Sequence, residues 1–113
     1  MFKVSKSGTI QLTRGDSAGI DLVITDSKTG LPYEIKEDDV ITMTLRKEPC
    51  KETPVLFEKK VTGTNKIYIK PEDTFNLCYG NYVYDVQLVN ASKDVYTVVP
   101  PSLFRVLPEV TME

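Results

Sequence analysis

The alternation of apolar and polar positions is clearest between Ile67 and Val89. In its second half the apolar positions recur at every other residue, at Tyr82, Tyr84, Val86 and Leu88. Because strand side chains repeat every two residues, this pattern predicts one strand with an apolar face and a mixed face. A shorter alternating run at Ile67 and Ile69 precedes it, separated by the corner Pro71–Thr74, where one helical turn can begin at the proline. We expect the two strands to belong to opposite sheets.

Further segments show strand patterns between turn signals, namely residues 9–13, 18–25, 40–47, 55–61 and 95–107, while residues 31–35 form a short extended piece in which Pro32 disfavours a central strand. The run Glu58–Lys60 breaks the apolar pattern of the fifth segment, which predicts an exposed edge strand. Pro100 and Pro101 cannot donate ladder hydrogen bonds. We therefore expect them to interrupt the last strand with a kink, a bulge or a change of sheet.

Seven or eight short strands with frequent turn signals are typical of an all-β sandwich. At 113 residues the chain fits one domain, so we predict a single antiparallel β-sandwich over residues 1–113. Tyr82 follows the corner, and in an immunoglobulin-like sandwich a tyrosine at this place bonds back to the preceding loop. The predicted fold is therefore an all-β, immunoglobulin-like sandwich.

Composition excludes several classes of partner. The net charge of −2 lacks the basic excess that a phosphate-binding surface needs, so we expect no nucleic acid as partner. No apolar run approaches the roughly 18 residues that cross a bilayer, so we expect no membrane insertion. The N-terminal run M-F-K-V-S-K-S-G lacks the apolar core of a signal peptide, and we expect synthesis in the cytoplasm.

The sequence offers little catalytic or metal-binding chemistry. Histidine is absent, and Cys50 and Cys78 can form at most one bridge; free thiols are the favoured interpretation. The carboxylates of Glu37–Asp39 and Glu72–Asp73 lack calcium-loop spacing and are interpreted as solvated loop charge. We expect no catalytic, cofactor-binding or metal site, and no enzyme activity.

Two features could instead mark a binding surface. Arg14-Gly15-Asp16 matches a tripeptide that some cell-surface receptors recognise, but glycine and aspartate also turn a chain between strands, and the turn is favoured. The six tyrosines could stack on sugars or bases. The alternation of side chains along the strand places Tyr82 and Tyr84 on its apolar face, so we assign both to the core. The candidates for a surface are Tyr33, Tyr68, Tyr79 and Tyr96.

Several segments taken together resemble the small immunoglobulin-like domain at the N-termini of phage baseplate upper proteins, a family encoded by phages and prophages of Gram-positive bacteria. The similarity covers roughly residues 9–111 and runs through L-T-R-G-D-S-A-G-I-D-L-V-I-T-D, G-L-P-Y-E-I, V-I-T-M-T-L-R-K, P-V-L-F-E-K-K, I-Y-I-K-P-E-D-T, Y-G-N-Y-V-Y-D-V-Q-L and F-R-V-L-P-E-V-T.

The resemblance implies a virion protein of a phage or prophage tail or baseplate, made in the bacterial cytoplasm. Its expected partners are other tail or baseplate proteins or copies of itself, and a homo-oligomer is expected. In that family the Arg-Gly-Asp group is the turn between the first two strands. The alternative function is an adhesion or carbohydrate-binding module that uses the turn Arg14–Ser17 or the surface tyrosines.

Overall fold

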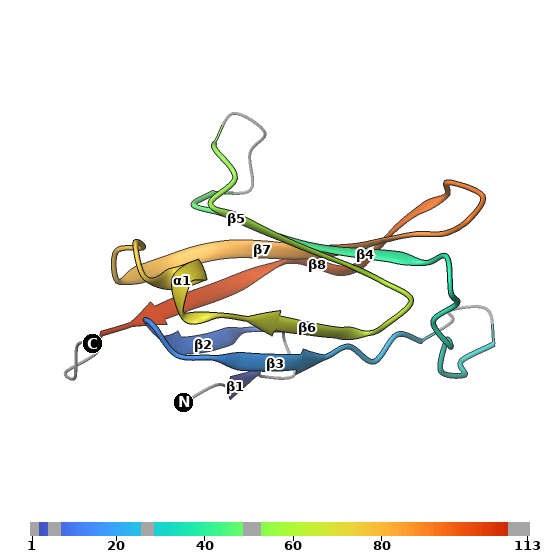
Figure 1. Cartoon of the computed structure of the whole chain (residues 1–113), viewed down its shortest axis with the longest axis horizontal. Coiled ribbons are helices and arrows are strands. Elements are labelled where there is room, and N and C mark those ends of the chain that lie inside the picture. Colours follow the sequence, from blue (N-terminus) through green and yellow to red (C-terminus); the bar gives the residue numbers. More distant parts are fainter. Residues whose placement is uncertain (1–2, 5–7, 26–28, 49–52, 109–113) are drawn as a thin grey trace.

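The structure consists of two β-sheets packed face to face (Figure 1). The computed structural model describes residues 3–4, 8–25, 29–48 and 53–108, with residues 3–4 described in backbone only. In chain order the elements are β1 (Lys3–Val4), β2 (Ile10–Thr13), β3 (Ala18–Asp21), β4 (Val40–Arg46), β5 (Phe57–Thr62), β6 (Lys66–Ile69), α1 (Pro71–Thr74), β7 (Gly80–Val89) and β8 (Val95–Leu107). The prediction of an all-β sandwich is confirmed.

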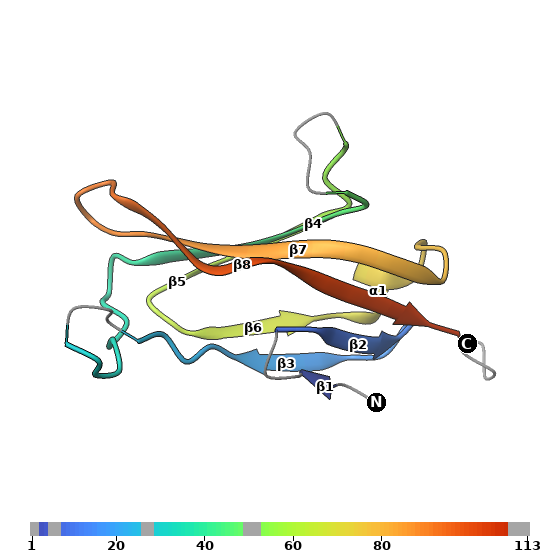
Figure 2. The same cartoon turned by 180° about the vertical axis from the view of Figure 1, so that it is seen from behind.

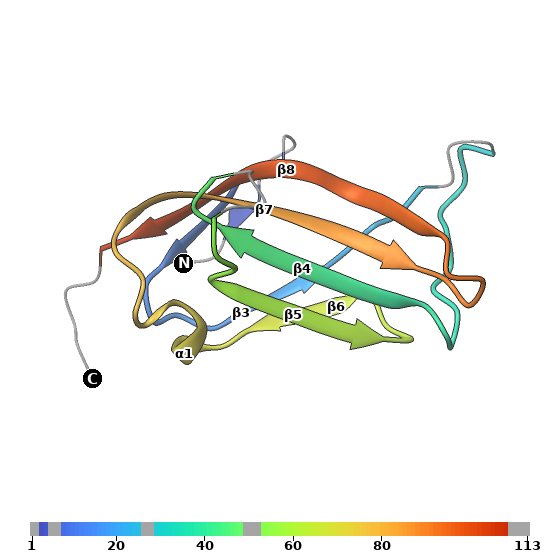
Figure 3. The same ribbon diagram turned by 90° about the horizontal axis from the view of Figure 1, so that it is seen from above.

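The larger sheet has six strands in the order β1-β2-β8-β7-β4-β5, and the smaller sheet pairs β3 with β6. Seen from above, β8, β7, β4 and β5 lie side by side over the smaller sheet (Figure 3). Most pairs are antiparallel, as expected. The exception is β2, which runs parallel to β8 from Ile10 opposite Phe104 to Thr13 opposite Leu107. This pairing joins segments from the two ends of the chain.

Strand β7 lies inside the larger sheet and keeps the alternation of its sequence. Its side chains Tyr82, Tyr84, Val86 and Leu88 are buried, as their parity predicts. The rest of the core comes from the inner faces of the other strands: Ile10, Leu12, Ala18, Ile20, Ile41, Met43, Leu45, Phe57, Ile67, Ile69, Phe104 and Val106. Fully burying such a side chain contributes about 1.5–3 kcal/mol, so this face supplies the main stabilisation.

The corner between β6 and β7 joins the two sheets, as the sequence predicts. Strand β6 belongs to the smaller sheet and β7 to the larger one, with α1 between them at one end of the sandwich (Figure 1, and from behind in Figure 2). Pro71 begins α1, and the Asp73 carboxylate accepts a 2.7 Å hydrogen bond from the backbone N–H of Lys70. Thr74 is buried and accepts a 2.9 Å hydrogen bond from the N–H of Gly15. The corner is thereby tied to the β2–β3 turn.

Strand β8 differs from the prediction at its two prolines. The strand is continuous from Val95 to Leu107 instead of being interrupted, and it stays in one sheet. The expected bulge does occur: Tyr84 lies opposite Ser102 and Val86 opposite Val99, so Pro100 and Pro101 together face Asp85. A bulge leaves residues outside the regular ladder. Prolines can therefore stay inside this strand.

Two other strand limits also differ from the sequence patterns. The ladder of β3 ends at Asp21 instead of Thr25, although Leu22 and Ile24 still pack against the core. Strand β5 begins at Phe57 rather than Val55 and forms the edge of the larger sheet, as its charged residues predict.

Candidate functional site

The turn Arg14–Ser17 is a structural corner. The Arg14 guanidinium donates hydrogen bonds to the Leu77 carbonyl at 3.4 Å and the Tyr79 hydroxyl at 3.1 Å. It also lies over the Tyr79 ring, 4.5 Å from the centroid. Gly15 has φ +85°, a conformation that suits glycine. Because Arg14 contacts its own domain, the geometry favours the turn over a receptor-binding tripeptide.

The interpretation as solvated loop charge is wrong for Asp39 and for Asp73, whose carboxylate is only 13% exposed. Asp39 is buried, and its Oδ2 accepts a 2.6 Å hydrogen bond from the Tyr33 hydroxyl and a 2.9 Å bond from the Lys36 N–H. These bonds compensate the burial of a carboxylate. Tyr33 is correspondingly half-buried and packs against the core, so its prediction as a surface tyrosine is wrong. The sequence carries no pattern that distinguishes Asp39 from its exposed neighbours Glu37 and Asp38.

The Tyr33–Asp39 contact also affects titration. The pKa of Tyr33 is raised from 10.0 to about 12, first because its hydroxyl bonds to Asp39 and second because it is desolvated. Burial likewise raises the pKa of Tyr82 and of Tyr84. These tyrosines stay protonated near neutral pH and stabilise loops and corners. The Tyr84 hydroxyl, for example, donates to the Gly8 carbonyl.

The other predicted site residues remain apart. Asp73 pairs with Lys59 of β5, with 2.6 Å between Nζ and Oδ2. Within the described part of the chain, no three Cys, Asp or Glu side chains are grouped so that they could hold a metal ion. Cys78 is exposed and its thiol is free, whereas Cys50 lies outside the described residues.

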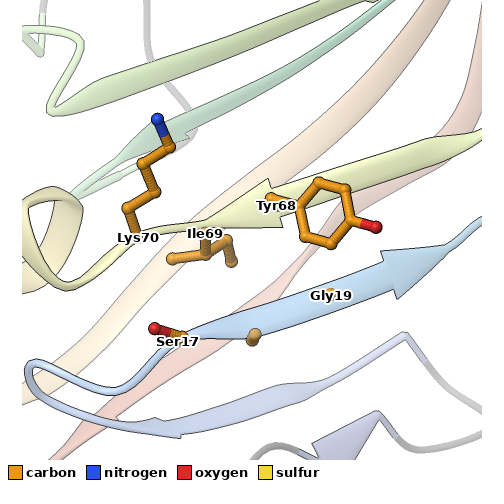
Figure 4. Close-up of a pocket in the computed structure, with 6 residues that line it drawn as sticks. Ser17, Gly19, Tyr68, Ile69 and Lys70 are labelled. Atoms are coloured by element: carbon orange, nitrogen blue, oxygen red, sulfur yellow. The ribbon is translucent and has the colours of Figure 1, made fainter.

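The outer face of the smaller sheet carries the best candidate for a binding site. Strands β3 and β6 pair so that Gly19 lies opposite Tyr68, and the Tyr68 ring lies along β6 at the side next to β3 (Figure 4). A Cβ atom at Gly19 would lie only 3.3 Å from the Tyr68 ring. The ring therefore lies close to the backbone of Gly19, in space that a larger side chain at this position would need. Even so, 62% of Tyr68 is exposed.

A shallow hollow of about 400 Å³ adjoins this ring. We call its lining the Tyr68 surface: Ser17, Ala18, Gly19, Tyr68, Ile69 and Lys70. The Tyr68 ring supplies the exposed apolar atoms of the hollow, whereas Ala18 and Ile69 are buried in the core. Ser17 adds a hydroxyl, and the Lys70 side chain extends away from Tyr68 (Figure 4). The hollow can receive an apolar or flat group with an acceptor or an anionic group beside it.

Sequence reasoning found half of this site. The outward parity of Tyr68 between Ile67 and Ile69 predicts a surface tyrosine, and that prediction is confirmed, as it is for Tyr79 and Tyr96. Gly19 was missed because its importance depends on the β3–β6 register. The one available signal was a glycine inside a strand pattern, which marks a close approach of another group.

The comparisons with known proteins assign no family to the chain. No protein-family model matches it, and no curated protein sequence is significantly similar to it. Among the described residues, no helix has the length and apolar character needed to span a membrane.

Proposed function

We propose that this protein is a non-enzymatic structural or assembly component of a phage or prophage tail or baseplate that acts through protein–protein contacts. The observation that carries the proposal is the Tyr68 surface: a largely exposed tyrosine ring placed over Gly19 beside an apolar hollow. The phage setting comes from the segment resemblance described above.

The geometry suits recognition of a protein surface. Tyrosine is enriched among residues that dominate interface energies, because its ring buries a large area at a small entropic cost. Here the pairing of β3 with β6 positions the ring before binding, so little conformational entropy is lost when a partner binds. Lys66 on β6 and Lys70, just after its end, lie two residues on either side of Tyr68 and add positive charge to this part of the surface. The favoured partner surface offers an apolar side chain beside a carboxylate.

The test is made in virus particles. Particles from an induced lysogen encoding the protein should contain many copies of the chain by quantitative mass spectrometry. The Tyr68→Ala variant should be incorporated roughly tenfold less, as expected for loss of an interface anchor. Val23→Ala, which shortens another highly exposed side chain, is the matched control and should assemble normally. Absence of the chain from purified particles would overturn the proposal.

The second candidate function is a carbohydrate-binding or adhesion module, and the same ring favours it. An exposed aromatic face with polar groups beside it can receive a sugar ring. Glycan-array binding that is lost in Tyr68→Ala, while the unfolding midpoint is unchanged, would support this candidate. Asp16→Ala should leave such binding intact, since the turn is held by internal contacts. Turnover of any substrate by the purified domain would contradict both functions.

A further inference from the structure

The strand β8 is covered on only part of one side. Strand β2 pairs with residues 104–107 alone, while β7 pairs along nearly the whole length of the other side. Within the described residues, no strand pairs with 95–101 on the side away from β7. The register with β7 is regular from Val95 to Thr97 and shifts by one residue at Val98. In an antiparallel sheet, alternate residues direct their N–H and C=O groups to each side, so the regular part of this stretch presents backbone groups to a neighbour.

This open edge differs in character from the opposite edge of the same sheet. Strand β5 carries Glu58, Lys59 and Lys60, and Lys59 points inward to pair with Asp73. Charges on an edge strand, inward-pointing ones above all, oppose pairing with another chain. The β8 stretch Val95–Val99 has no charged residue, and Val95 and Tyr96 are both more than half exposed.

The limits of the open edge define a symmetric register. Asp94 ends the stretch on one side, and Pro100, which has no N–H, ends it on the other. The five residues between them are centred on Thr97. In an antiparallel pair of identical strands with Thr97 opposite Thr97, Val95 and Tyr96 of one copy face Val98 and Val99 of the other, and the one-residue shift at Val98 lies beside the axis in both copies. Apolar residues thereby meet apolar residues across a two-fold axis.

We propose that a second copy of this chain docks at β8 residues 95–99, with the two strands antiparallel and Thr97 on the two-fold axis. The inference rests on the assembly role proposed above and names its partner. A net charge of −2 leaves little repulsion between copies. A five-residue contact is smaller than the roughly 1,200 Å² of stable interfaces. The dimer therefore forms weakly and gains strength where many copies are concentrated.

Sedimentation velocity of the full chain between about 10 μM and about 1 mM tests the inference. The wild type should shift toward a dimer as concentration rises. Thr97 is exposed, so Thr97→Lys and Thr97→Glu should fold normally by circular dichroism. Each should weaken self-association by roughly three- to tenfold, because like charges then face each other. An equimolar mixture of the two variants should restore the dimer.

The matched control is Thr62→Lys, which adds the same charge to an exposed threonine on the β5 edge and should dimerise like the wild type. A wild type that stays monomeric over the whole range overturns the inference, as does a Thr97→Lys variant that associates normally. Failure of the mixture to restore the dimer overturns the register. These solution results do not depend on incorporation into particles, so they separate failure of this inference from failure of the proposed function.

Discussion

The hydroxyl of Tyr82 donates a 2.6 Å hydrogen bond to the carbonyl oxygen of Cys78, four residues earlier in the chain. The bond closes the loop between α1 and β7 onto the start of the central strand. It is the contact that the position of Tyr82 after the corner predicts for an immunoglobulin-like sandwich. Lys47, the residue after β4, lies over the Tyr82 ring with its Nζ 4.6 Å from the ring centroid, and covers the same corner.

The first prediction concerns this bond. Tyr82→Phe keeps the ring in the core but removes the donor, so the free energy of unfolding should fall by about 1 kcal/mol. Urea denaturation measures the change. Tyr68→Phe is the control, because 62% of Tyr68 is exposed, and it should cost less than about 0.5 kcal/mol. Equal costs for the two variants would show that the Cys78 bond does not hold the corner.

The second prediction concerns stability at high pH. The pKa of Tyr33 is about 12 in the folded protein against the usual 10.0, so the folded state holds this proton more tightly than the unfolded chain. The resulting stability is fully present below about pH 10 and is lost as the pH rises through about 12. Tyr82 and Tyr84, whose pKa values burial raises, act in the same direction.

Urea unfolding at several alkaline pH values should therefore show a decline in the wild type and a shallower decline in Tyr33→Phe. Asp39→Asn removes the charged acceptor, so the pKa of Tyr33 should fall toward 10.0. Absorbance of the tyrosinate form follows this titration, with Tyr33→Phe identifying the signal. An unchanged Tyr33 titration in Asp39→Asn would exclude the Asp39 bond as the main cause.

The third prediction compares two ion pairs of β5. Asp73 is mostly buried, pairs with Lys59 at 2.6 Å and accepts the N–H of Lys70. Asp73→Ala should lower the free energy of unfolding by about 1–2 kcal/mol, since it removes a helix-start bond and an ion pair together. Glu58, by contrast, pairs with Lys60 at 3.9 Å in an exposed position. Glu58→Ala should have almost no effect on thermal or urea unfolding.

The fourth prediction separates backbone strain from crowding. Gly63 and Gly30 have nearly the same φ, +70° and +72°. A Cβ atom at Gly63 would lie 3.2 Å from the Glu37 carbonyl oxygen, whereas one at Gly30 meets nothing within 4 Å. Both alanine variants should lose about 1 kcal/mol to the left-handed conformation. Gly63→Ala should lose about 1 kcal/mol more, because the buried Asp39 holds the loop that carries Glu37.

Calorimetric unfolding of Gly63→Ala and Gly30→Ala under one set of conditions measures this difference. Equal losses would mean that the Glu37 backbone yields to the new methyl group.

Local sequence patterns predicted most of the features that depend on neighbouring residues, such as which face of a strand is buried and where a turn begins. The parity of Tyr82 and Tyr84 identified the buried face of β7, and Pro71 marked the start of the single helical turn. The outward position of Tyr68 identified half of the candidate site. These features follow from side-chain periodicity and from the fixed φ of proline, which act within a few residues.

The sequence by itself determined most of the segments that become strands, which of their faces are apolar and where the chain turns. Only the tertiary structure decided that β2 joins β8 in parallel, that Gly19 lies under the ring of Tyr68, and that Asp39 is buried against Tyr33. The physical reason is that these contacts depend on register between strands distant in the sequence. Register is set by the packing of whole faces in the core, and local patterns leave it open.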